Sequence, residues 1–259
     1  MTLTLEQAGR WLPLRAFPDR GGLPLFCLPH AGGGASAYRA WLGKVPGVDV
    51  LPVQPPGREA RLRDAPHEEM ASLVGELAGV LAEAAGSRPF AVYGHSLGAL
   101  VAFETLREIR RRGGEQPVRL FVSGCVAPQC RYDDGPPVVG MSQPELVQML
   151  RQLGGTPDWL LADPEVLRMI LPAVRADFSV KETYSYVAEP ALDVPVTVLA
   201  STADARAPYR WQEKWRELTS ADFTMHTLTG GHFAVFERAD LTLGHIAAGL
   251  QKWVPSTVR

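Results

Sequence analysis

A serine between two glycines is the residue of this chain best placed to act as a catalyst. The pentapeptide Gly-His-Ser-Leu-Gly spans residues 94–98 and places Ser96 directly after an apolar run at 90–93. A stretch with helical spacing begins at Leu97, so the serine lies on a turn between a predicted strand and a predicted helix. A helix N-terminus behind the hydroxyl stabilises negative charge that develops there. The pattern therefore predicts that Ser96 is a nucleophile.

A serine nucleophile requires a base, and three histidines follow Ser96 in the chain. His226 lies within a strand-like run, and His245 lies within the last predicted helix. His232 instead lies in the turn Gly-Gly-His-Phe at 230–233, after the last predicted strand. That position is at the edge of the sheet where the serine emerges. We therefore expect His232 to accept the serine proton.

An acidic residue must orient the histidine, and Asp204 has the required position. It follows the apolar run 196–200 by four residues. Asp193 precedes that run, at the opposite end of the strand, and Asp222 begins the next strand. The alternative for Asp204 is a structural role in a turn or at a helix N-cap. We expect Asp204 to complete a Ser-His-Asp triad.

Acyl transfer also needs two donors for the oxyanion that forms on the attacked carbonyl. The backbone N–H of Leu97, which follows the nucleophile, is one expected donor. The second is expected from the loop Pro-His-Ala-Gly-Gly-Gly at 29–34, after the first main strand. This loop is similar to the His-Gly-Gly-Gly loop of esterases, with Ala31 following the histidine. We assign the second donor to the N–H of Ala31 and a loop-fixing role to His30.

Short apolar runs alternate with stretches of helical periodicity along the chain. The runs are apolar on both faces, which favours a parallel sheet covered by helices. The predicted strands span 24–28, 48–53, 90–93, 120–123, 196–200 and 223–228. The predicted helices between and after them span 68–85, 97–112 and 240–253. With the serine turn, this alternation predicts a mostly parallel, doubly wound α/β sheet of the α/β-hydrolase fold.

The interval between the fourth and fifth predicted strands is too long for a simple crossover, which needs about a dozen residues or more. It contains helical patterns of its own at 142–153 and 164–184. We expect a helical lid over the active site at about residues 128–190, within a single domain of residues 1–259. Large apolar lid residues are candidates for the acyl-binding surface, although such residues more often only pack. They are Met149, Trp159, Met169, Phe178 and Tyr184.

Composition disfavours several other classes of protein. The 259 residues carry a formal net charge of −2, so no nucleic-acid partner is expected. Three cysteines without paired spacing form no disulfide framework or zinc motif, and no metal or organic cofactor is expected. No apolar stretch reaches the roughly 20 residues that span a bilayer, and the N-terminus lacks a signal-peptide pattern. We expect a cytoplasmic protein without membrane association, and a monomer.

Several motifs together resemble the type II thioesterases, which serve polyketide and nonribosomal peptide assembly lines. They lie at 25–33, 54–59 (Gln-Pro-Pro-Gly-Arg-Glu), 93–99, 101–104, 153–157, 171–178, 182–184 and 230–233. The serine turn alone is common to many hydrolases, whereas its combination with the first two motifs is specific. The likeness spans nearly the whole chain. One departure is Ser201, where the family usually has a glycine three residues before the acid.

This resemblance implies hydrolysis of acyl thioesters held on the phosphopantetheine arm of an acyl or peptidyl carrier protein. The cellular role would be removal of aberrant or stalled short acyl groups, through an acyl-enzyme on Ser96. Alternatives of the same fold are a chain-releasing or medium-chain fatty acyl thioesterase and a carboxylesterase. A noncatalytic receptor is the alternative from another class, and such proteins usually lack one member of the triad.

Two groups of charged residues have structural interpretations. Arg58 and Glu59 are neighbours in the motif at 54–59 and are expected to hold that loop by an ion pair. Arginines cluster at the end of the 97–112 helix, where a solvated helix end is favoured over a docking surface for an acidic carrier. They are Arg107, Arg110, Arg111 and Arg112.

Overall fold

The computed structural model of this chain describes residues 9–15, 21–132 and 135–254. Among these residues, six strands form one sheet in the order β2-β1-β3-β4-β5-β6, and all neighbouring strands are parallel. The strands are β1 (Leu23–Leu28), β2 (Val48–Pro52), β3 (Ala91–His95), β4 (Arg119–Ser123), β5 (Val196–Ser201) and β6 (Phe223–Leu228). The ends of each strand lie within two residues of a predicted strand, and the predicted α/β fold class is confirmed.

Each face of the sheet has its own apolar core. Strand β1 contributes to both, because Phe26 and Leu28 pack on one face while Leu25 and Cys27 pack on the other. This division follows from the two-residue alternation of side chains along a strand. All four side chains are almost completely buried. Burying a leucine or phenylalanine side chain contributes about 1.5–3 kcal/mol, so the doubly covered strands supply much of the stability of the fold.

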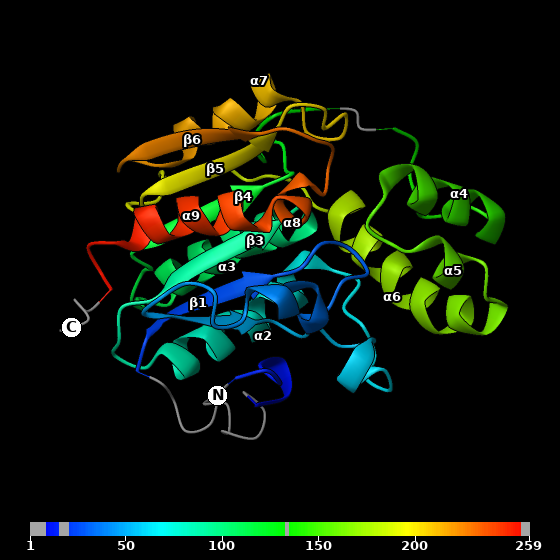
Figure 1. The fold of residues 1–259 in the computed structure, drawn as a ribbon, viewed down its shortest axis with the longest axis horizontal. Helices are drawn as coiled ribbons and strands as arrows, with labels where there is room; N and C mark the ends of the chain where they lie inside the picture. The colour runs from blue at the N-terminus through cyan, green and yellow to red at the C-terminus, as the bar shows by residue number, and fades with distance from the viewer. Residues whose placement is uncertain (1–8, 16–20, 133–134, 255–259) are drawn as a thin grey trace.

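Helices cover both faces of this sheet (Figure 1). One face is covered by α2 (Met70–Ala85) and α3 (Leu97–Arg111). The other is covered by η1 (Ala35–Trp41), α8 (Ala234–Glu237) and α9 (Ala239–Leu250). Helices α2, α3 and α9 match the three helices predicted between and after the strands. The short helices η2 (Glu59–Arg61), α7 (Tyr209–Gln212) and η3 (Glu213–Leu218) were not predicted.

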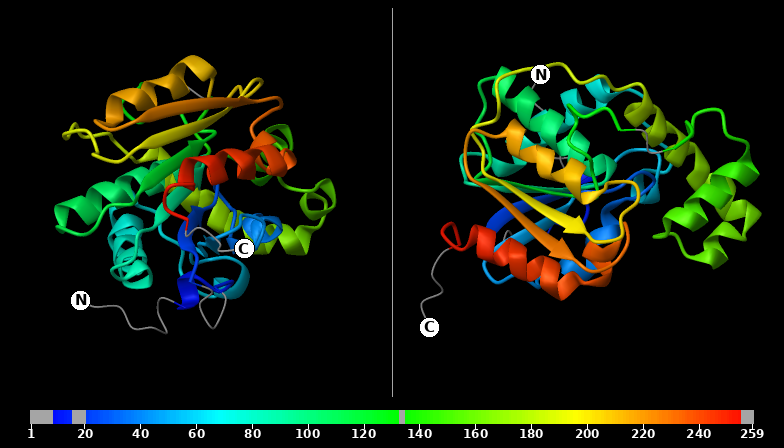
Figure 2. Two further views of the ribbon diagram at one scale, coloured as in Figure 1. Left: turned by 60° about the vertical axis from the view of Figure 1, so that its left-hand side comes forward. Right: turned by 90° about the horizontal axis from the view of Figure 1, so that it is seen from above.

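Between β4 and β5 the chain forms three helices that we call the helical insertion. They are α4 (Gln143–Leu153), α5 (Asp158–Leu161) and α6 (Pro164–Glu182). Ser142 and Glu145 form a capping box at the start of α4. Asp163 caps α6 by accepting hydrogen bonds from the N–H groups of Glu165 and Val166. The insertion has an apolar cluster of its own and lies at the end of the sheet toward which the strands point (Figure 2).

Candidate active site

Ser96 lies on a sharp turn between β3 and α3. Its backbone adopts φ +54° and ψ −121°, which is a strained conformation for a residue with a side chain. A Cβ at Gly94 would lie 2.3 Å from the carbonyl oxygen of Gly98, and a Cβ at Gly98 would lie 2.2 Å from that of Leu28. Only glycine fits at these two positions. The N–H of Ser96 donates to the carbonyl of Ser123 at 2.8 Å, which ties the turn to β4.

His232 and Asp204 come from the loops after β6 and β5, and they form a buried pair. The distance from His232 Nδ1 to Asp204 Oδ2 is 2.9 Å, and the two side chains are 6% and 0% exposed. The other carboxylate oxygen, Oδ1, accepts from the N–H groups of Arg206 at 3.0 Å and Ala207 at 3.1 Å. These bonds orient the carboxylate toward the ring. With a proton on Nδ1, the second ring nitrogen of His232 is free to act as a base.

Ser96 and His232 both line one cavity of about 830 Å³. Within the described residues, the hydroxyl of Ser96 forms no hydrogen bond, either to His232 or to another group. In enzymes without substrate, the hydrogen bond between nucleophile and base is often long or poorly aligned and tightens when substrate binds. The structure therefore brings the three predicted triad residues to the carboxyl end of the sheet and two of them to the lining of one cavity.

The two predicted oxyanion donors lie at the same cavity. Ala31 and Leu97 line it together with Ser96. In the described part of the chain, the N–H groups of Ala31 and Leu97 donate to no protein acceptor, although their neighbours Gly33 and Ala99 do. Two N–H groups that have no protein acceptor and belong to residues lining the cavity beside the candidate nucleophile are available to donate to an oxyanion.

Two further histidines surround His232. Burial, and then the proximity of His232 and Arg58, lowers the pKa of His30 to about 4. Burial, followed by His232 and His30, holds the pKa of His95 well below its usual range. Both rings are therefore neutral near pH 7. The ring centres of His95 and His232 are 4.9 Å apart, so the uncharged His95 packs against the candidate base. The hydroxyl of Ser123 lies 2.9 Å from His95 Nδ1 and holds this ring.

The large apolar residues predicted for the lid have three different environments. Phe178 and Tyr184 line the cavity, and the Tyr184 hydroxyl donates to Glu104 at 2.7 Å. Met149 lies outside the cavity lining, packed within the insertion with its sulfur 3.5 Å from an Arg206 nitrogen. Two others face solvent on the insertion, namely Trp159, 71% exposed, and Met169, 47% exposed. The four-residue helix α5 buries only Leu161, which leaves its tryptophan outside.

The expected ion pair between Arg58 and Glu59 is wrong. Arg58 instead pairs with Asp177 of α6, and Glu59 accepts hydrogen bonds from Ser36. Asp177 lies within the motif at 171–178, but no sequence pattern links it to Arg58, which is 119 residues away. No role near the site was predicted for it.

The arginines at the end of α3 are held by the protein itself. Arg107, Arg110 and Arg111 all pair with Glu189, in the segment that leads back from the insertion to β5. Arg112 pairs with Glu108 at 2.7 Å. Each of these arginines already has a carboxylate partner within the protein, which disfavours a docking surface. The expected solvated helix end is wrong for Arg107, which is only 3% exposed.

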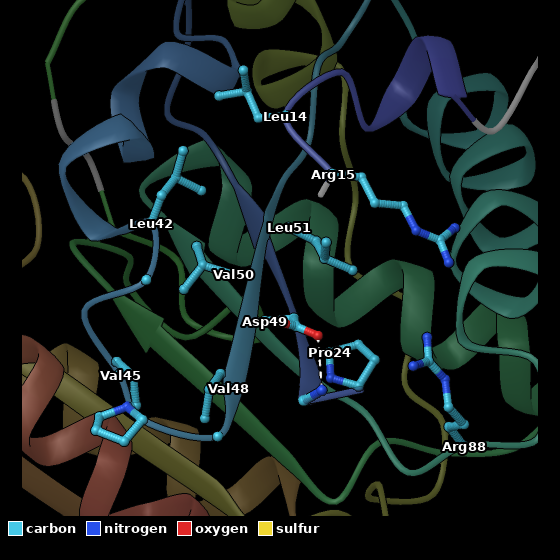
Figure 3. Close-up of a pocket in the computed structure, with 14 residues that line it drawn as sticks. Leu14, Arg15, Pro24, Leu42, Val45, Val48, Asp49, Val50, Leu51 and Arg88 are labelled. Atoms are coloured by element: carbon cyan, nitrogen blue, oxygen red, sulfur yellow. Dashed lines mark hydrogen bonds between the residues drawn. The ribbon is translucent and has the colours of Figure 1, made fainter. Parts of the chain in front are cut away.

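A second cavity lies at the amino ends of β1 and β2, away from Ser96. Its volume is about 360 Å³, and the Asp49 carboxylate at its wall accepts a hydrogen bond from the N–H of Gly22 at 2.9 Å (Figure 3). Among the described residues that line it there is no serine, cysteine or histidine. This cavity therefore has no nucleophile or base of the kind found around Ser96.

Other kinds of site are not found among the described residues. No group of three or more histidine, cysteine or acidic side chains is arranged to hold a metal ion there. In the same part of the chain, no helix has the length and apolar character needed to cross a bilayer.

The parallel sheet, the strained serine turn and the loops after β5 and β6 define an α/β-hydrolase fold. The thioesterase domain family matches residues 23–250, and this chain belongs to that family. It is 36% identical to the gramicidin S biosynthesis protein GrsT of Aneurinibacillus migulanus, over 90% of this chain and 91% of that protein. The resemblance drawn from the motifs is thus confirmed at the level of the family.

Solved structures of type II thioesterases and related enzymes are similar in both sequence and fold. The type II thioesterase BorB from the borrelidin biosynthetic cluster is 40% identical, with a TM-score of 0.80 over 90% of this chain and 94% of BorB. The thioesterase RedJ from the prodiginine pathway of Streptomyces coelicolor is 35% identical, with a TM-score of 0.82 over 94% and 100% of the two chains. The protein described here is therefore a thioester hydrolase.

Proposed function

We propose that this thioesterase removes short acyl groups from the phosphopantetheine thioester of a carrier protein in a polyketide or nonribosomal peptide assembly line. The observation that carries the chemistry is the buried His232–Asp204 pair at 2.9 Å, whose histidine shares a cavity with Ser96. The assembly-line setting is supported by the relatives, which are named for gramicidin S, borrelidin and prodiginine biosynthesis.

The proposed reaction begins when His232 takes the proton of the Ser96 hydroxyl. The serine oxygen attacks the thioester carbonyl, and the N–H groups of Ala31 and Leu97 donate to the oxyanion. When the tetrahedral intermediate collapses, the C–S bond breaks and His232 returns its proton to the departing thiol. Water, deprotonated by the same histidine, then attacks the acyl-enzyme. The bond from the acyl carbon to the Ser96 oxygen breaks, the acid is released, and His232 returns the proton to that oxygen. Asp204 stabilises the imidazolium that forms in each half of the reaction.

The reaction needs an entry for a long, flexible arm as well as space for the acyl group. A cavity of about 830 Å³ lies toward the upper end of the range for small-molecule sites, about 300–1,000 Å³. It is bounded by Phe178 and Tyr184 from the side of the insertion and by the oxyanion residues from the side of the sheet. An apolar pocket discriminates one methylene by only about 1–3 kcal/mol, so we propose broad tolerance for groups such as acetyl and propionyl.

The test is kcat/KM for one acyl group presented on a carrier protein, on coenzyme A and on N-acetylcysteamine. We expect the carrier-bound form to be preferred, because contacts with the carrier add binding beyond the arm. Equal values for the three substrates would contradict a carrier-protein substrate. A strong preference for a medium-chain fatty acyl group would instead support a chain-releasing enzyme, and faster cleavage of simple oxygen esters would support a carboxylesterase.

A further inference from the structure

The loop at residues 29–34, which we call the oxyanion loop, is hydrogen-bonded to the helical insertion. The N–H of Gly32 donates to Asp177 Oδ2 at 2.6 Å, and Asp177 lies in the last two turns of α6. Gly32 directly follows Ala31, whose N–H faces the cavity in the proposed mechanism. A carboxylate from the insertion therefore orients the peptide group next to the proposed oxyanion donor.

Arg58 fixes the same carboxylate and the same loop. Its two terminal nitrogens donate to Asp177 Oδ2 at 2.7 Å and to Oδ1 at 2.8 Å, and one of them also reaches the carbonyl of Gly33 at 3.3 Å. The side chains of Arg58 and Asp177 are 7% and 8% exposed. The pair thus binds the N–H of Gly32 and the carbonyl of Gly33. These two groups lie on either side of the peptide bond that joins Gly32 to Gly33. Bidentate pairs of this kind have a well-defined geometry.

The backbone of the oxyanion loop also touches α6 directly. Gly32 has φ +76°, and a Cβ on it would lie 2.7 Å from a methyl carbon of Val174. Val174 precedes Asp177 by three residues, so both side chains lie on the face of α6 that meets the loop. The backbone of Gly32 therefore lies in close contact with α6, with no room for a side chain between them.

We propose that Asp177 and Arg58 are positioning residues of the oxyanion hole, which couple the placement of α6 to transition-state stabilisation. This inference rests on the proposed function, because it takes the N–H of Ala31 as an oxyanion donor. A buried ion pair is a poor source of net stability compared with apolar residues of the same size. The pair lies between the loop and the insertion, and its hydrogen bonds set the orientation of the Gly32 N–H and the Gly33 carbonyl. A pair of apolar side chains would not orient these groups.

The decisive variant is the double substitution R58M/D177L, which replaces both charges by apolar groups of similar size. Since neither partner is left as an unpaired buried charge, we expect this variant to fold. The single substitution D177N keeps an acceptor for Gly32 but loses the charge pair. Removing an oxyanion donor outright costs about 10²–10³-fold in kcat. For a displaced donor we expect about 10–100-fold lower kcat in the double variant, a smaller loss in D177N, and little change in KM.

Three measurements separate positioning from a general structural role. Acetyl-N-acetylcysteamine turnover is expressed per active site, with sites counted by end-point labelling with a fluorophosphonate. Affinity is measured for a trifluoromethyl ketone, which forms a tetrahedral adduct with the serine. Thermal unfolding reports stability. In R58M/D177L we expect the ketone affinity to fall by about the same factor as kcat, because both depend on the oxyanion hole.

Arg107 provides the matched control, because it is a buried arginine with ion pairs to Glu104 and Glu189 but no contact with the oxyanion loop. R107M should lower the melting temperature and leave kcat per active site within twofold of wild type. If R58M/D177L also keeps wild-type kcat and ketone affinity per active site, the positioning role is wrong. Failure of the proposed function looks different, since it would appear in the wild-type protein as equal kcat/KM on carrier protein, coenzyme A and N-acetylcysteamine, whatever the variants do.

Discussion

The two sides of the candidate active site are held in place by different parts of the molecule. Ser96, Asp204 and His232 follow strands β3, β5 and β6. Asp204 is bonded to His232 and to the N–H groups of its own loop, and the N–H of Ser96 is bonded to β4. The oxyanion loop follows β1 but is bonded to Asp177 of the helical insertion. The sheet and its loops therefore position the candidate nucleophile and base, whereas the loop that carries one candidate oxyanion donor is also bonded to the insertion.

This difference separates the residues proposed to react with substrate from a contact that can regulate the reaction. Residues at the carboxyl ends of parallel strands are placed by the core of the fold, which opens only on global unfolding. A contact between a loop and an inserted helix can be lost without unfolding the sheet. In such a thioesterase the proposed triad can stay assembled while a movement of α6 changes the geometry of the proposed oxyanion hole.

The largest effect is expected from S96A, which removes the nucleophile. Loss of a triad member typically costs about 10⁴–10⁶-fold in rate, and the fold should be unchanged because Ser96 makes no side-chain hydrogen bond in the described structure. Single-turnover assays on an acyl thioester, with circular dichroism to check folding, provide the measurement. Retention of more than a few per cent of wild-type activity would remove Ser96 from the mechanism.

D204N should reduce kcat by about 10⁴-fold without unfolding the protein. The amide favours the wrong tautomer of His232, because its nitrogen donates where the carboxylate accepted. D193N and D222N are the matched controls, since both aspartates lie after the nucleophile in the chain but are not bonded to His232. We expect both controls to keep near wild-type kcat. A silent D204N together with a crippled D193N would contradict the assignment of the third triad member.

On the oxyanion side, acid should destabilise the protein through His30. The pKa of this ring, whose Nδ1 is buried, is lowered from about 6.5 to about 4, so above pH 6.5 the ring is neutral in both folded and unfolded chains. Between pH 6.5 and 4 only the unfolded chain is protonated, and stability falls as the pH falls. At 1.36 kcal/mol per unit, the loss attributable to His30 is about 3 kcal/mol, and it ends below pH 4.

Urea unfolding of wild type and H30N at pH 7, 5.5 and 4 measures this effect. We expect H30N to be less stable than wild type at pH 7 but to lose less stability on acidification. His95, whose pKa is also lowered, contributes to the loss that remains in H30N. The same fall in both proteins would show that His30 is not held in its neutral form.

Local sequence patterns predicted the sheet and the serine turn, because both features depend on residues that are close together in the chain. Short apolar runs predicted each of the six described strands. The glycines at 94 and 98 predicted the serine turn, because no other residue fits at those two positions. The partner of Arg58 was missed because an ion pair between segments 119 residues apart produces no recognisable spacing of charged residues in the sequence. The exposure of Trp159 was missed for a related reason, since the four-residue helix α5 is too short to show which of its faces is buried.

The smallest effect concerns motion within the insertion. Helix α6 is anchored by the Arg58–Asp177 pair, whereas α4 and α5 pack mainly within the insertion. Segments with few contacts to the main core open more readily, so amides of α4 and α5 should exchange hydrogen at least about ten-fold faster than those of β3 and β4.

Amides of α6 near Asp177 should exchange at an intermediate rate, and R58M/D177L should speed their exchange while leaving the strands unchanged. Mass spectrometry of exchanged peptides separates these regions. Uniform protection of insertion and sheet would contradict a movable lid, and unchanged exchange in the double variant would show that the ion pair does not anchor α6.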